Sequence, residues 1–175
     1  MVEDGGPDDG VGDVGNIGHA RRQFEVTIAG QRDVLEIAGA TILNDSYNSN
    51  PEALRSMIQS LASRPAQRRI LIAGEMLEMG THAEGAHAAC GKAAAEAGID
   101  LVVGVRGNAQ HLAAAACWGG TASIFLPDAQ TAGEWLAKNV QPGDVILIKG
   151  SRGVGLERSI DVLKDQIAIA SSETQ

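Results

Sequence analysis

Short apolar runs and longer segments with helical spacing alternate along most of the chain. The runs expected to form strands are residues 40–45, 68–74, 99–105, 121–127 and 144–150. The segments expected to form helices are residues 51–64, 83–98, 109–117, 132–140 and 156–170. Strands that are apolar almost throughout are typical of a parallel sheet buried on both faces. The pattern therefore predicts an α/β domain with a mainly parallel sheet that helices cover on both sides.

The N-terminal part of the chain does not follow this pattern. Residues 1–21 are rich in glycine and acidic residues and have no apolar period. This composition predicts a flexible lead-in, followed by one domain over residues 22–175. The alternation of apolar and polar residues over positions 24–45 predicts two or three strands, with Gly30 and Gly39 at turns.

Composition and charge narrow the possible functions. The formal net charge of −8 argues against a surface for nucleic acid or anionic lipid, which would need clustered Lys and Arg. The chain has no apolar run of membrane-spanning length and no signal-peptide pattern, which predicts a cytoplasmic protein that acts on small molecules. Cys90 and Cys117 form no redox or zinc motif, and the histidines lack ligand spacing, so no metal site is predicted. Trp118 and Trp135 are expected to be packing anchors.

The first candidate loop follows the expected strand 40–45 and leads into the next helix. In such sheets, ligands bind at the carboxyl ends of the strands, where this loop lies. It offers a carboxylate, a phenol ring and amides that can both donate and accept hydrogen bonds. Its candidate residues are Asp45, Tyr47, Asn48 and Asn50. The structural alternative is a helix cap, because Asn50 before Pro51 is a favourable N-cap.

The second candidate loop, residues 74–80, follows the strand 68–74. Its acidic side chains could bind a substrate ammonium group and its apolar ones an alkyl chain. The candidate residues are Glu75, Met76, Leu77 and Glu78. The structural alternative is a helical turn that buries Met76, Leu77 and Met79 in the core. His87 lies downstream, where it could face the loop, although a lone histidine is more often a structural residue.

The third candidate loop, residues 149–155, follows the buried strand 144–149 and opens the last helix. Its glycines leave backbone N–H groups free to approach an oxyanion, Ser151 can donate, and Lys149 and Arg152 add positive charge. The glycine order is neither that of a Walker A loop nor that of a dinucleotide fingerprint. The structural alternative is a glycine-rich turn with solvated bases.

Together and in this order, the three loops resemble the Mur ligase family, and in particular its members that add D-alanyl-D-alanine. The resemblance rests on DSYNSNP, on GEMLEMG with a downstream His, and on KGSRGVGLE, and it covers about residues 32–164. It implies a Rossmann-like three-layer domain with a mainly parallel sheet of about six strands. In the family, this is the C-terminal domain, after an N-terminal domain for the UDP sugar and a central P-loop ATPase.

The resemblance also implies a reaction. UDP-muramoyl-tripeptide is phosphorylated by ATP with Mg²⁺, and the amine of D-alanyl-D-alanine then attacks to give an amide, ADP and phosphate. By carry-over, the candidates of the first loop lie near the adenosine and those of the second near the dipeptide. Ser151 would bind the dipeptide carboxylate or the reacting phosphate, and Lys149 and Arg152 would be catalytic cations there.

The sequence departs from the family in one respect. It contains no GxxxxGK(S/T) motif, and the roughly 30 residues before the resemblance begins leave no room for a central domain. We therefore expect ATP and Mg²⁺ to be bound mainly by a separate domain, and this chain to be inactive without the N-terminal and central domains. One alternative is a non-catalytic nucleotide- or anion-binding module with the same fold. Another is a free Rossmann-type domain, which the glycine order disfavours.

Overall fold

The structure, a computed structural model, describes residues 33–173. The expected lead-in over residues 1–21, the start of the domain at residue 22 and any strand before residue 33 lie outside the described residues.

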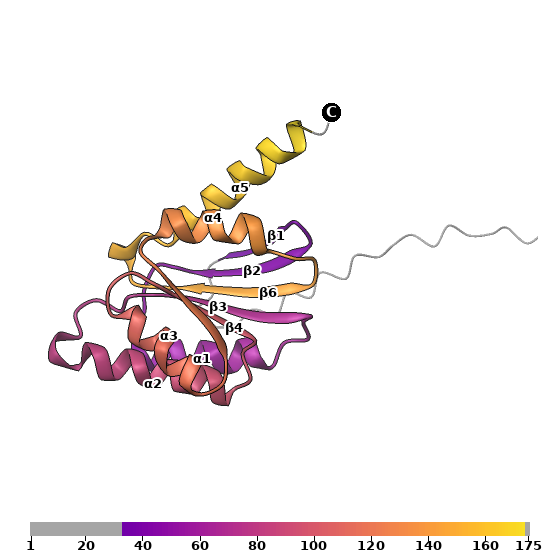
Figure 1. Ribbon diagram of the computed structural model, residues 1–175. Helices are drawn as coiled ribbons and strands as arrows, with labels where there is room; N and C mark the ends of the chain where they lie inside the picture. The colour runs from indigo at the N-terminus through magenta and orange to yellow at the C-terminus, as the bar shows by residue number, and fades with distance from the viewer. Residues whose placement is uncertain (1–32, 174–175) are drawn as a thin grey trace, which may run out of the picture.

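Within residues 33–173, six strands form one sheet in the order β1-β2-β6-β3-β4-β5 (Figure 1). The strands are β1 (Asp33–Ile37), β2 (Ala40–Asp45), β3 (Arg68–Gly74), β4 (Leu101–Val105), β5 (Ala122–Leu126) and β6 (Asp144–Lys149). β1 pairs antiparallel with β2, and the other neighbours are parallel. The two-residue turn between β1 and β2 has positive φ at both Ala38 and Gly39, as tight hairpins of this twist require. The mainly parallel sheet of about six strands is thus confirmed.

Helices cover both faces of the sheet (Figure 1). One face carries α1 (Pro51–Ala62), α2 (Ala83–Glu96) and α3 (Ala109–Trp118), and the other carries α4 (Ala129–Asn139) and α5 (Glu157–Ser172). Two short 3₁₀ turns, η1 (Gly80–His82) and η2 (Arg152–Val154), precede α2 and α5. None of the described helices is both long and apolar enough to cross a membrane. Because helices lie on both faces of the sheet, the three-layer α/β prediction is confirmed for the described residues.

Two hydrophobic cores lie on opposite sides of the sheet, because successive side chains of a strand point to opposite faces. In β3, Leu71 belongs to the core beneath α1, α2 and α3, whereas Ile70 and Ile72 belong to the core beneath α4 and α5. Leu54 of α1 and Leu136 of α4 are the fully buried helical counterparts. The two cores hold the helices against the sheet, and so they fix the positions of the loops at the ends of the strands.

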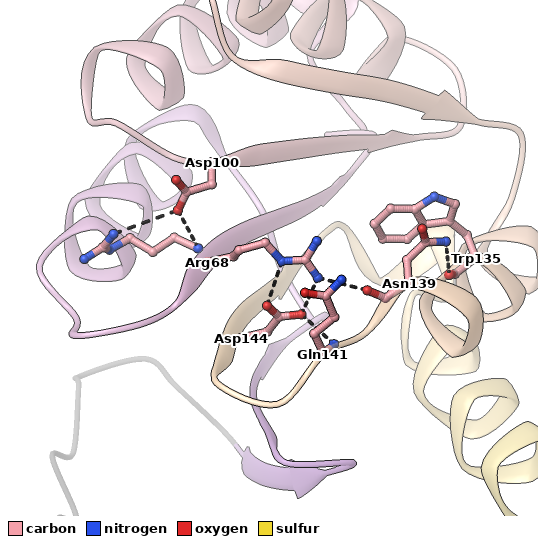
Figure 2. Close-up of polar contacts among 7 residues, drawn as sticks. Arg68, Asp100, Trp135, Asn139, Gln141 and Asp144 are labelled. Carbon is pink, nitrogen blue, oxygen red and sulfur yellow. Dashed lines mark hydrogen bonds and ion pairs between the residues drawn. The ribbon is translucent and has the colours of Figure 1, made fainter.

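The central strand β6 begins and ends with a buried charge. At its start, both carboxylate oxygens of Asp144 accept hydrogen bonds from Arg68, from Nε at 2.8 Å and from a terminal guanidinium nitrogen at 2.7 Å (Figure 2). Arg68 also donates to the Asn139 carbonyl, and the Gln141 N–H donates to Asp144. The hydrogen bond to Asp144 raises the pKa of Arg68. This cluster ties β3, β6 and the end of α4 together at the amino edge of the sheet.

The order in which the chain adds strands to the sheet reverses at β6. From β2 the chain crosses to β3, continues outward to β4 and β5, and then returns to place β6 between β2 and β3. Ligands of open α/β sheets bind at such a reversal, outside the carboxyl ends of the strands. The loops after β2, β3, β4 and β6 all start at this carboxyl edge of the sheet.

Candidate functional site

A buried ion pair joins the first and third candidate loops. Asp45 and Lys149 are register partners at the ends of β2 and β6, and their side chains meet with Nζ 2.6 Å from Oδ2. Lys149 also donates to the backbone carbonyl of Asn48 at 2.7 Å, and its side chain is 3% exposed. Lys149 thus has two acceptors inside the protein, and its predicted catalytic role stays a prediction.

Tyr47 and Arg152 form a second, exposed connection between the same loops. A terminal nitrogen of Arg152 donates to the Tyr47 hydroxyl at 3.1 Å, and the guanidinium carbon lies 5.1 Å from the centre of the ring. This distance is that of a cation–π contact. Tyr47 is 44% exposed, and Arg152 is exposed as well. The pair therefore presents a flat ring and a cation to solvent at the carboxyl edge.

Asn50 caps α1, as its position before a proline predicts. Its side-chain oxygen accepts the Ala53 N–H at 2.8 Å, and its backbone is extended. Asn48, by contrast, is exposed, and its contact with Lys149 uses only its backbone carbonyl. The structural alternative therefore accounts for Asn50 but leaves the side chains of Tyr47 and Asn48 at the surface.

A buried histidine binds the backbone of the second candidate loop from the interior of the domain. Nε2 of His87, on α2, accepts the Met76 N–H at 2.8 Å, and Nδ1 lies 2.6 Å from the Ala83 carbonyl. The carbonyl requires a proton on Nδ1, so the ring is the neutral Nδ1-H tautomer. His87 is fully buried, and this burial lowers its pKa. Its position beneath the loop confirms that it faces the loop, in a structural role.

The second loop divides into buried and exposed residues. Met76 is 1% exposed and belongs to the core, as the structural alternative predicted, and Met79 packs against it. Leu77 is half-buried, and its N–H donates to the Ser151 hydroxyl at 3.0 Å, which joins the second loop to the third. Glu78 is exposed and has φ of +66°, an uncommon conformation for a residue with a side chain. Glu78 is therefore the acidic residue of this loop that faces solvent.

Glu75 turns toward the loop after β4, in which no candidate residue was predicted. Its Oε1 accepts hydrogen bonds from the backbone N–H of Asn108 at 3.1 Å and from the Asn108 side chain at 3.0 Å. Its Oε2 lies 3.9 Å from Nε of Arg106. Another nitrogen of the same guanidinium, Nη1, donates to the Gly153 carbonyl at 2.7 Å. Arg106 and Asn108 are thus additional residues of this edge. The signal for them was their place directly after a parallel strand.

The described residues fit an oxyanion or a nucleotide better than a metal ion. No group of three His, Cys, Asp or Glu side chains within residues 33–173 could hold a metal. Asp45, which contacts the third loop, is already paired with Lys149. The exposed guanidinium of Arg152 and the accessible ring of Tyr47 are suited to a negatively charged ligand with a planar group. These side chains are therefore suited to bind an anion rather than Mg²⁺.

The chain matches known proteins over most of its length. The family described as Mur ligase, glutamate ligase domain, matches residues 32–152. The chain is similar to the UDP-N-acetylmuramoyl-tripeptide–D-alanyl-D-alanine ligase of Mycobacterium leprae, with 34% identity over an alignment of 150 residues. That alignment covers 75% of this chain and 29% of the relative. It is also similar to the ligase of that name from Escherichia coli, with 34% identity over 124 residues, 71% of this chain and 27% of the relative.

A solved structure of a ligase from the same family also resembles the chain. The MurF ligase of Thermotoga maritima, crystallised in complex with ADP, superimposes with a TM-score of 0.67 at 26% identity and covers 82% of this chain. That superposition covers 32% of the Thermotoga chain. The chain spans less than a third of the length of these relatives.

Proposed function

Because the chain belongs to the Mur ligase family, we propose that it is the C-terminal domain of an ATP-dependent ligase that adds D-alanyl-D-alanine to UDP-N-acetylmuramoyl-tripeptide. The relatives from Mycobacterium leprae and Escherichia coli carry that activity in their names, which supports the choice of amino substrate. In this proposal, the chain works in the cytoplasm on peptidoglycan precursors. Its partners are the N-terminal and central P-loop domains, in the same polypeptide or a separate one.

The observation that carries the proposal is that three polar loops, far apart in sequence, are bonded to one another at one edge of the sheet. Lys149 and Asp45 join the loops after β6 and β2, and Arg152 and Tyr47 join them again at the surface. The Leu77 N–H and the Ser151 hydroxyl join the loops after β3 and β6. A ligand at this edge would meet all three loops at once, as a reaction that brings ATP, a carboxylate and an amine together requires.

The residues of the edge would have different tasks in the reaction. When bound, ATP supplies the phosphoryl group that activates the tripeptide carboxylate. Arg152 offers exposed positive charge to the oxyanions that develop, and Tyr47 offers a flat surface to the nucleotide. Glu78 is the solvent-facing acid for the incoming ammonium group. Lys149 is buried between Asp45 and Asn48, where it joins the first and third loops. Any charge that it contributes to the reaction acts from the interior side of these loops.

The proposal can be tested by reconstitution. The chain is mixed with the N-terminal and central domains of a D-alanyl-D-alanine-adding Mur ligase, and phosphate release is measured with ATP, Mg²⁺, UDP-muramoyl-tripeptide and D-alanyl-D-alanine. We expect turnover only in the mixture. Arg152→Ala should reduce kcat by about 10-fold or more, because one lost charge-assisted hydrogen bond costs about 1.5–3 kcal/mol.

A matched control separates the site from general effects of charge. Arg158 is also exposed but lies on α5, where its Nε donates to Gln130. Arg158→Ala should leave turnover unchanged. No phosphate release in a mixture of folded components would support the non-catalytic binding module instead. Turnover with another amino substrate but not with D-alanyl-D-alanine would assign the chain to another branch of the family.

A further inference from the structure

The acidic residue that opens the second candidate loop has its carboxylate engaged inside the protein. Both oxygens of Glu75 face the turn after β4: Oε1 binds the backbone and side-chain nitrogens of Asn108, and Oε2 lies beside Arg106. The Glu75 side chain is only 14% exposed. We propose that Glu75 is a positioning residue that folds the Arg106–Asn108 turn and holds the Arg106 guanidinium against the loop after β6, rather than a contact to substrate.

The backbone of the turn is shaped around this carboxylate. Arg106 and Gly107 both have positive φ, at +70° and +48°. A Cβ at Gly107 would overlap the carboxylate atoms of Glu75 and would displace them, and the positive φ also favours glycine at this position. Arg106 has no such freedom, and its left-handed conformation needs support from its neighbours. That support comes from Glu75 on one side and Gly153 on the other.

The consequence of this arrangement is a fourth loop in the site. Arg106 is 48% exposed, and its Nη1 donates to the Gly153 carbonyl at 2.7 Å, next to the exposed Arg152. The guanidinium of Arg106 is therefore held at the carboxyl edge together with the three loops described above. This inference rests on the proposed function, in which the loops after β3 and β6 receive the amino substrate. Loss of the turn should raise the KM for D-alanyl-D-alanine more than it lowers kcat.

A double-mutant cycle in the reconstituted ligase separates positioning from direct contact. Glu75→Ala and Asn108→Ala should each raise the KM for the dipeptide by about 10-fold, the effect of losing hydrogen bonds to a charged acceptor. The double variant should be no worse than either single variant, because both break the same contact. Glu75→Gln should recover most of the loss, since an amide oxygen can still accept the bonds from Asn108. Glu96→Gln, at an exposed position of α2, is the control without effect.

The alternative makes opposite predictions for the same variants. If Glu75 binds the substrate ammonium through its charge, Glu75→Gln will be as damaging as Glu75→Ala. Asn108→Ala will then leave the KM unchanged, or the two losses will add. Either of these results would overturn the proposal.

A second measurement does not depend on activity. Amide hydrogen exchange, followed by NMR on the whole chain, should show faster exchange of the Asn108 backbone N–H in Glu75→Ala and near-normal exchange in Glu75→Gln. Gly107→Ala should have the effect of Glu75→Ala, because the added methyl displaces the carboxylate. Unchanged protection of Asn108 in Glu75→Ala would refute the positioning role even in an active ligase. Absence of turnover in the wild type would refute the proposed function, while the exchange data would still decide the positioning role.

Discussion

Removal of either member of the buried pair Lys149–Asp45 should destabilise the domain far more than removal of a surface pair. The Lys149 side chain is 3% exposed and that of Asp45 is 11% exposed. Lys149→Met leaves a buried carboxylate without its cation and the Asn48 carbonyl without its donor. Asp45→Asn leaves a buried ammonium group without a compensating charge.

The expected cost follows from the loss of one partner rather than from the value of the pair. An uncompensated charge in a buried pair costs about 3–5 kcal/mol. Because a domain of this size is stable by about 5–15 kcal/mol, either variant should remain folded but lose a large share of its stability. The double variant Asp45→Asn/Lys149→Met removes both charges, and should therefore cost clearly less than the sum of the two single changes.

Urea unfolding followed by circular dichroism measures these differences. With a urea m value of about 1–3 kcal/mol/M, a loss of 3 kcal/mol shifts the midpoint by at least about 1 M. The matched control is Lys92→Met, which breaks an exposed pair with Glu96, 3.7 Å apart on α2, and should cost no more than about 0.5 kcal/mol. The reasoning fails if Lys149→Met and Lys92→Met lower stability equally, or if the two buried changes add.

Three further predictions concern single side chains. Burial lowers the pKa of His87, so the unfolded chain takes up a proton more readily than the folded one. Stability should therefore fall as the pH drops below about 6.5, by at most about 1.4 kcal/mol per pH unit, and His87→Gln should lack this part of the fall in urea titrations at pH 7.5 and 5.5. Burial raises the pKa of the Cys90 thiol to about 11, so a thiol reagent at pH 8 should modify only the exposed Cys117 until the protein is unfolded, and two equally fast thiols would contradict this. Gly91→Ala would push a methyl group into the backbone of α3 and should cost about 1–3 kcal/mol or more. Gly85→Ala, on the same helix in open space, should be neutral or stabilising, and thermal unfolding of both variants tests the difference.

The layers of the fold were predictable because the signals for them are local. The continuous apolar strands and the helical spacing of segments such as residues 51–64 are each visible in a short window of sequence. The positions of β6 between β2 and β3 and of β1 at an antiparallel edge were not predictable, because strand order depends on contacts between distant segments. The start of α4 was missed: Asp128, whose side chain accepts the Thr131 N–H, caps a helix that begins three residues before the predicted one.

Side-chain packing was harder to predict than the backbone. Trp118, expected to be a packing anchor, is 88% exposed at the end of α3, because residue type alone does not tell which way the last turn of a helix faces. The three candidate loops could be chosen from their polar residues and their place after buried strands. No candidate residue was predicted in the loop after β4. Its partner Glu75 lies more than 30 residues away, a contact that no local pattern reports.

The two basic residues of the loop after β6 show why burial has to enter the interpretation of a site. Lys149 and Arg152 are close in sequence, and both were predicted to be catalytic cations. In the structure, Lys149 is buried and bound to Asp45, whereas Arg152 is exposed beside Tyr47. A loss of activity in Lys149→Ala therefore cannot by itself identify a contact to substrate, since the same change releases two loops. A loss in Arg152→Ala without a loss of stability can, because the described contacts of Arg152 lie at the surface.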